Sequence, residues 1–168
     1  MNKILKIATV LTWINMIVWG LLCLNILFSI LAGTTALLIV FVLFSAIVLH
    51  SYASFQLQKS LKNPAVPLNN QTSTGIRFVG LVALFLGLLF AFVGVFMLTN
   101  ATFVFKFMED HSKASPNEIG FTLTVPRIRI IGLFYLLIGL SVAVNVNLNF
   151  RLLRWYYFLR NNSNDREK

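Results

Sequence analysis

The chain has 168 residues, of which 58% are hydrophobic and 11% are charged, and its formal net charge is +9. Soluble globular domains carry about 25% charged residues, so this composition excludes an ordinary water-soluble fold. The positive charge lies mostly beside hydrophobic stretches, which favours membrane lipid as its partner and excludes nucleic acid. The single cysteine, Cys23, excludes a disulfide within the chain.

Residues 7–58 contain no Lys, Arg, Asp or Glu. One helix that crosses a bilayer needs about 20 predominantly apolar residues, so this length predicts two spans, at 7–28 and 36–55. Between them, the sequence Ala32-Gly33-Thr34-Thr35 predicts a tight turn. A polar connector with two prolines follows at 56–77.

Two further spans are predicted at 78–99 and 128–150, and both carry glycines seven residues apart. Seven residues advance a helix by nearly two turns, so such glycines fall on one stripe. Small residues let two helices approach closely in lipid. We therefore expect these stripes to pack against neighbouring helices, including each other; the glycines are Gly80, Gly87, Gly94, Gly132 and Gly139.

The segment 100–126 between these spans shows a strand-like alternation at both ends. Phe103, Phe105 and Phe107 alternate with more polar residues, and the same rhythm returns over 119–125. This alternation predicts a small extracytoplasmic β-hairpin between the third and fourth spans. The competing interpretation continues the third helix through Phe107.

Basic residues divide unevenly between the two predicted sides of the membrane. Ten lie in the amino terminus, the 56–77 connector and the tail that begins at Arg151, whereas the 100–129 region holds four basic residues and three acidic ones. Because cytoplasmic loops carry the excess of Lys and Arg, both termini and the connector are predicted to be cytoplasmic.

The opening Leu5-Lys-Ile with Trp13, and the connector Lys62-Asn-Pro, resemble those of small four-span bacterial membrane proteins of unknown function. The resemblance implies a multi-pass protein of the bacterial inner (plasma) membrane. This chain departs from that group at its end, which reads Asn-Asp-Arg-Glu-Lys instead of an acidic Leu-Thr-Val-type tail. The likeness implies no function.

Polar residues within the spans are the candidate interior contacts. Asn145 and Asn149 share one helix face, from which Asn147 points away, and Asn15 in the first span is their expected partner. Hydrogen bonds of this kind hold helices together in lipid. His50 is a further candidate for an interior contact.

Arginines at the ends of the fourth span are candidate contacts for lipid headgroups. Two follow Pro126 on the outer side and three accompany the aromatic run Trp155-Tyr156-Tyr157-Phe158 on the inner side. Arginine and aromatic side chains together are typical of the membrane–water interface. The five arginines are Arg127, Arg129, Arg151, Arg154 and Arg160.

Groups that could carry chemistry are nearly absent from the spans, which contain no carboxylate. A zinc site needs three or four ligands, and the two histidines, His50 and His111, fall on opposite predicted sides. We therefore predict no catalytic residues, no bound cofactor and no metal site.

Together these patterns predict an all-α integral membrane fold, a single membrane domain over residues 1–168 that forms a four-helix bundle. The expected function is non-enzymatic: an accessory, assembly or regulatory subunit that acts through helix–helix contacts, as a homo-oligomer or with another membrane protein. The alternative is an oligomeric channel or small-solute transporter lined by the asparagines of spans one and four.

Overall fold

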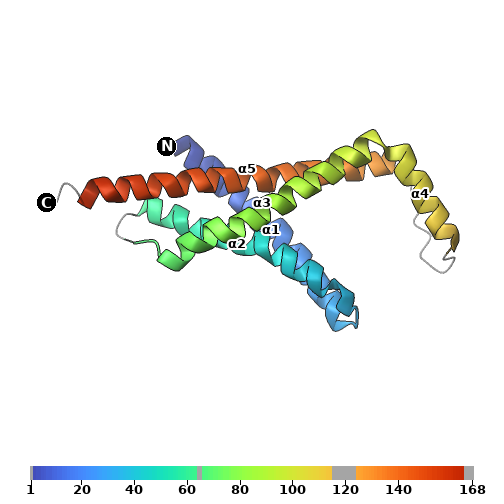
Figure 1. The fold of residues 1–168 in the computed structure, drawn as a ribbon, viewed down its shortest axis with the longest axis horizontal. Helices are drawn as coiled ribbons and strands as arrows, with labels where there is room; N and C mark the ends of the chain where they lie inside the picture. Colours follow the sequence, from blue (N-terminus) through green and yellow to red (C-terminus); the bar gives the residue numbers. More distant parts are fainter. Residues whose placement is uncertain (1, 64–65, 115–123, 165–168) are drawn as a thin grey trace. The chain divides into compact units, whose positions relative to one another are not determined.

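The computed structural model describes residues 2–63, 66–114 and 124–164, and its regular structure there is entirely helical (Figure 1). Four of its helices are long and apolar enough to cross a membrane, which confirms the predicted all-helical architecture at that level. In chain order the elements are α1 (Asn2–Leu31), the 3₁₀ turn η1 (Thr35–Leu37), α2 (Leu38–Lys62), α3 (Asn70–Thr99), α4 (Ala101–Ala114) and α5 (Val125–Asn164).

The helices extend well beyond the apolar runs, because polar residues continue them at both ends of the 56–77 connector. Helix α2 continues to Lys62 and stops where Asn63 turns extended, with φ −128° and ψ 94°. A residue before proline avoids the helical region, and Pro64 follows. Helix α3 begins where the side-chain oxygen of Asn69 accepts the N–H of Gln71 at 3.0 Å, an N-cap that satisfies one free donor.

The turn between α1 and α2 is a Schellman motif centred on Gly33. Its φ of +106° is a left-handed conformation that glycine adopts without the steric penalty of a Cβ. The N–H of Gly33 donates to the carbonyl of Ile30 at 3.0 Å, and that of Thr34 donates to Ser29 at 3.1 Å. These bonds satisfy the last carbonyls of α1 and return the chain directly into α2.

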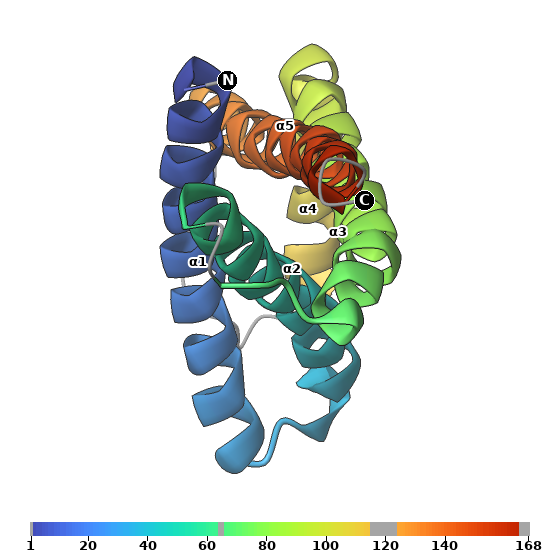
Figure 2. The ribbon, with the colours of Figure 1, turned by 90° about the vertical axis from the view of Figure 1, so that its left-hand side faces the viewer.

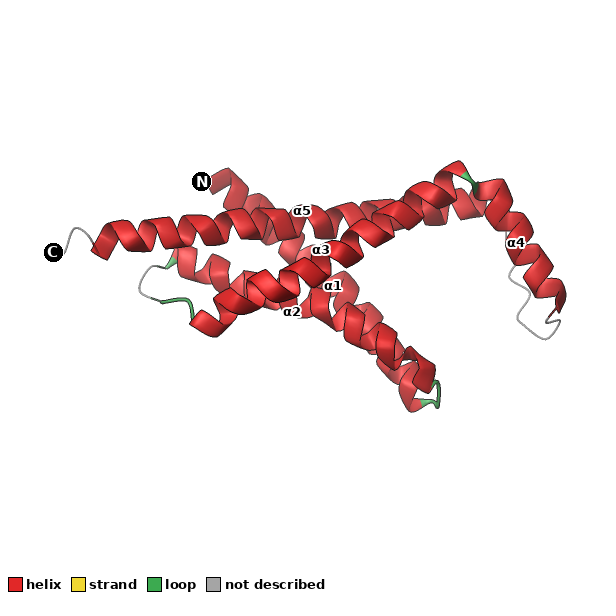
Figure 3. Ribbon diagram, viewed as in Figure 1, coloured by secondary structure: helices red, strands yellow, loops and turns green. Residues whose placement is uncertain are grey.

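The first strand of the predicted β-hairpin is wrong, because residues 101–114 form helix α4 (Figure 3). The alternation of Phe103, Phe105 and Phe107 covers only a few residues, and the same residues are also compatible with an amphipathic helix. Thr102, Lys106 and Glu109 fall on one helix face, three or four residues apart. The rings of Phe103 and Phe107, one turn apart, stack with centroids 6.5 Å from each other.

The alternative interpretation, a third helix that continues through Phe107, is nearer to the structure, although the helix is interrupted at Asn100. Hydrogen bonds run across this interruption: Asn100 N–H donates to the carbonyl of Phe96 at 2.8 Å, and Val104 N–H donates to that of Asn100 at 3.0 Å. Residues 115–123, which include most of the second predicted strand, lie outside the described residues.

The chain divides into two compact units, called here unit 1 (residues 1–86 and 141–168) and unit 2 (residues 87–140). Unit 1 contains α1, α2, the first part of α3 and the second part of α5 (Figure 2). Its core joins the start of α1, the end of α2, the start of α3 and the tail of α5. The core residues are Leu5, Ala8, Leu57, Leu68, Ile76, Leu152 and Leu153.

Two tyrosines of α5 fasten the α2–α3 connection to this end of unit 1. The hydroxyl of Tyr156 accepts the backbone N–H of Leu68 at 2.9 Å, and the hydroxyl of Tyr157 is hydrogen-bonded to that of Ser73. The predicted interfacial aromatics thus act as structural anchors as well. Together with the core contacts of the start of α1, these bonds bring three segments rich in basic residues to one end of unit 1: the start of α1, the α2–α3 connection and the tail of α5.

Candidate functional site

A cluster of buried polar side chains lies between α1, α2 and α5 in unit 1, and we call it the polar core. Helices α1 and α5 each supply residues three or four positions apart, which therefore share one face, and α2 supplies Gln58. Asn15, Asn145 and Asn149 are each 2% exposed or less. The polar core consists of Thr12, Asn15, Gln58, Ser141, Asn145 and Asn149.

Gln58 joins all three helices through its amide nitrogen. This nitrogen donates to the hydroxyl of Thr12 on α1 at 3.0 Å and to the side-chain oxygen of Asn149 on α5 at 3.1 Å. The Thr12 hydroxyl in turn donates to the side-chain oxygen of Asn145 at 3.0 Å. Each of these groups therefore depends on a partner from another helix.

The asparagines of α5 complete the polar core. Asn149 donates through Nδ2 to both the backbone and the side-chain oxygens of Asn145, at 2.8 and 3.0 Å. Asn15 donates to the carbonyl of Ser141 at 3.4 Å, and the Ser141 hydroxyl donates back to Asn15 Oδ1 at 3.2 Å. Asn147 is exposed, and its one hydrogen bond within the described residues goes to the carbonyl of Ala143 in its own helix.

His50 lies near the polar core, enclosed by α2, α3 and α5, and is 1% exposed. Its Nε2 is 3.3 Å from the hydroxyl of Ser54, and its ring meets that of Phe150 edge to face with centroids 6.3 Å apart. A Cβ at Gly80 would lie 2.9 Å from the imidazole and 2.7 Å from the Phe150 ring. Gly80 therefore makes room for the histidine side chain rather than for a neighbouring backbone.

The other four predicted glycines bring α3 and α5 together in unit 2. A Cβ at Gly139 would lie 2.5 Å from the carbonyl oxygen of Gly87, and it would also meet the backbone nitrogen of Ala91. A Cβ at Gly132 would lie 3.0 Å from the carbonyl oxygen of Gly94. Backbone therefore packs on backbone at both places, and even a methyl group would force the helices apart.

The described part of unit 1 is strongly cationic and holds no Asp or Glu. The sequence places the only carboxylates of this unit, Asp165 and Glu167, beyond the described residues. Arg151, Arg154 and Arg160 are exposed along α5, whereas Arg127 and Arg129 are exposed at its start in unit 2. The described basic residues of unit 1 are Lys3, Lys6, Lys59, Lys62, Arg77, Arg151, Arg154 and Arg160.

Sequence reasoning missed three members of the polar core, Thr12, Gln58 and Ser141. Gln58 falls in the predicted polar connector, although it shares a helix face with His50 and Ser54 at intervals of four residues. Thr12 lies three residues before Asn15, and Ser141 lies four residues before Asn145. The helical spacing from a polar residue within the spans is the signal that could have found all three.

The chemistry available in the polar core is hydrogen bonding. Amide and hydroxyl side chains keep one charge state near neutral pH, so they serve as donors and acceptors rather than as acids or bases. Within the described ranges, no group of three or more His, Cys, Asp or Glu side chains could hold a metal ion. Comparison with protein-family models, with curated proteins and with solved structures finds no match for this chain.

Proposed function

We propose that this chain is a multi-pass protein of the bacterial inner membrane. Four helices of sufficient length and apolarity support the insertion, and so do the large hydrophobic side chains on their outer surfaces. Ile39 and Phe78, for example, are each 72% exposed. Such surfaces are unfavourable in water but suit the hydrocarbon of a bilayer.

We further propose that both chain ends and the α2–α3 connection face the cytoplasm. The unit 1 core joins the start of α1, the end of α2 and the tail of α5, so their basic residues belong to one end of that unit. The positive-inside rule assigns this end to the cytoplasmic side.

The function we propose is non-enzymatic: an accessory, assembly or regulatory subunit that acts through helix–helix contacts with another membrane protein or with copies of itself. The observation that carries this proposal is the mutual hydrogen bonding of the polar core. Its amides join α1, α2 and α5 to one another, as expected of interhelical contacts that hold a bundle together.

The alternative, an oligomeric channel or small-solute transporter, has one observation in its favour. The side-chain oxygen of Gln58 is buried and has no hydrogen-bond donor among the described residues. A buried acceptor of this kind suits a site that a polar solute or water enters. Its five neighbours in the polar core, by contrast, already bond to one another or to Gln58 Nε2.

Purification from native membranes with quantitative mass spectrometry tests the proposal. A stoichiometric membrane-protein partner, or a defined homo-oligomer without solute flux, is expected. The second measurement compares solute flux into proteoliposomes for the wild-type protein and Asn145→Leu, with Asn147→Leu as the control. Flux that only Asn145→Leu abolishes would favour the transporter and overturn the contact function.

A further inference from the structure

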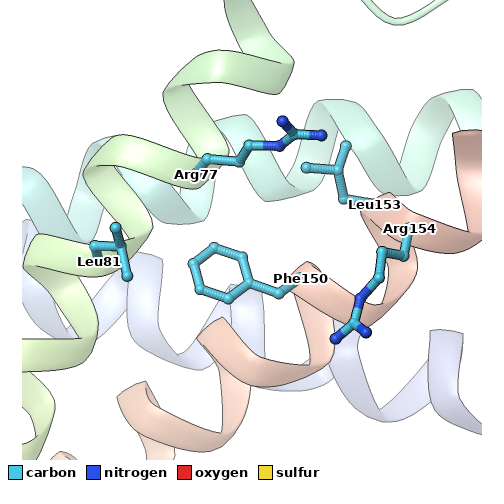
Figure 4. A pocket seen from close by; sticks show the side chains of 5 residues that line it. All are labelled: Arg77, Leu81, Phe150, Leu153 and Arg154. Carbon is cyan, nitrogen blue, oxygen red and sulfur yellow. The ribbon is translucent and has the colours of Figure 1, made fainter.

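A groove between α3 and α5 in unit 1 combines an apolar floor with two arginines (Figure 4). Its volume is about 340 Å³, and Arg77 and Leu81 of α3 face Phe150, Leu153 and Arg154 of α5 across it. The guanidinium groups of Arg77 and Arg154 lie on different sides of the Phe150 ring (Figure 4). The groove therefore offers two cationic groups beside an apolar surface.

The charges of these arginines have no counterpart within the described protein. Neither Arg77 nor Arg154 forms an ion pair in the described ranges, where unit 1 contains no Asp or Glu. The Arg77 guanidinium lies 5.6 Å from the centre of the Tyr157 ring, a contact that positions the side chain without neutralising it. An anion from outside the chain would be favoured here.

We propose that this groove binds an anionic phospholipid. Its headgroup oxygens accept hydrogen bonds from Arg77 and Arg154, and an acyl chain lies over Leu81 and Phe150. The inference rests on the membrane location proposed above and adds a defined site to it. Basic sites between membrane helices on the cytoplasmic side are known to hold anionic headgroups.

The apolar part of the groove favours a phospholipid over a free phosphate ion. A small anion would use the arginines alone and leave the exposed Leu81 and the groove side of the Phe150 ring uncovered. An acyl chain covers those side chains, while the phosphate meets guanidinium groups whose planar geometry suits its oxygens. Both features of the groove are then used by one molecule.

Lipid retention on the purified full-length protein tests the site. The protein in detergent is titrated with phosphatidylglycerol or phosphatidylcholine, and bound lipid is counted by native mass spectrometry. We expect a preference for phosphatidylglycerol that falls about fivefold for Arg77→Gln and again for Arg154→Gln, which corresponds to about 1 kcal/mol per charge near an anionic surface.

Lys59→Gln is the control, because Lys59 is an exposed cation at the same end of unit 1 but does not line this groove. It should change retention less than twofold. An equal loss in all three variants would show diffuse charge attraction and overturn the site. Competition by millimolar inorganic phosphate would overturn the lipid in favour of a free anion.

Leu81→Trp tests the apolar half of the groove, with Phe78→Trp as its control on the neighbouring exposed face. Leu81→Trp should lower phosphatidylglycerol retention, whereas Phe78→Trp should not. Equal retention in both variants would overturn the acyl-chain contact.

Alkaline carbonate extraction separates the proposed membrane location from the proposed lipid site. A protein that stays in the membrane pellet but shows no lipid preference overturns only this inference.

Discussion

At the scale of single residues, two kinds of contact hold the described helices together, and each tolerates a different kind of substitution. In the polar core, Gln58 and Asn145 form hydrogen bonds that reach across helices. At Gly132 and Gly139, the contact is made by backbone atoms, and there is no space for a side chain. The first kind is sensitive to chemistry, whereas the second is sensitive to volume.

Asn145→Leu should destabilise the protein by about 1–3 kcal/mol, because it removes the acceptor for Thr12 and leaves buried polar groups without partners. Asn147→Leu makes the same exchange at an exposed position and should change stability by less than about 0.5 kcal/mol. Reversible unfolding in mixed micelles measures both. Equal losses would contradict the buried network.

Gly139→Ala should also destabilise the protein, by about 1–3 kcal/mol, because the new methyl group meets backbone atoms of Gly87 and Ala91 that cannot move independently. The control is Gly20→Ala, where no heavy atom beyond the adjoining helix backbone lies within 4 Å of the added Cβ. Alanine is the better helix former, so the control should keep or slightly raise the thermal midpoint. A fall in the control as large as that in Gly139→Ala would contradict the packing argument.

At the scale of elements, the sequence predicts the long helices well and their ends less well. In lipid, an uninterrupted apolar segment satisfies its backbone hydrogen bonds internally only as a helix, so such segments predict the four long helices. The ends depend on local capping, such as the Asn69 side chain and the extended Asn63, and on polar residues that remain helical because they pack against neighbours. Gln58 is the clearest example, since it looks like a loop residue but is buried.

The polar core is predictable in part for the same physical reason. Asn15, Asn145, Asn149 and His50 are conspicuous as polar residues within apolar runs, and all four are buried. Thr12 is inconspicuous, because a threonine can satisfy its hydroxyl within its own helix. Only the three-dimensional structure shows that it bonds to Asn145 instead.

The region of α4 shows how a short pattern can mislead. Three alternating phenylalanines satisfy a strand with period two, but the polar positions Thr102, Lys106 and Glu109 satisfy a helix over a longer stretch. The helical pattern is the better predictor of the secondary structure here, because it covers a longer stretch and includes a complete polar face.

A cysteine scan over residues 101–110 in a Cys23→Ser background tests the α4 assignment. Labelling by a membrane-impermeant maleimide should be strongest at 102, 106, 109 and 110 and weaker at 101, 104 and 105, which follows the exposure of those residues in the helix. Strong labelling at every second position would instead restore the strand.

At the scale of the whole molecule, charge and helix length set the expected relation to the bilayer. Helix α5 has 40 residues, which at 1.5 Å per residue gives about 60 Å, twice the thickness of a bilayer's hydrocarbon core. In the proposed membrane location, part of this helix is therefore expected to extend into the interface or beyond it. Its basic and aromatic segment, which runs from Arg151 to Arg160, is the natural part to do so.

Reporter fusions test the proposed orientation. Alkaline phosphatase should be active when it is inserted after Ala114 and inactive when it is fused after Lys62 or Lys168, whereas a cytoplasmic fluorescent reporter should show the reverse pattern. Both results follow from the excess of basic residues on the cytoplasmic side. Phosphatase activity after Lys168 would contradict the orientation.

The glycine turn after α1 has a consequence for how the protein is made. Only Ala32, Gly33 and Thr34 separate α1 from η1, so a ribosome delivers the second apolar helix almost immediately after the first. No hydrophilic stretch exists there that could remain behind while α1 entered alone. The two helices are therefore expected to partition from the translocation channel as a pair, and a β-branched residue at position 33 would strain the turn that joins them.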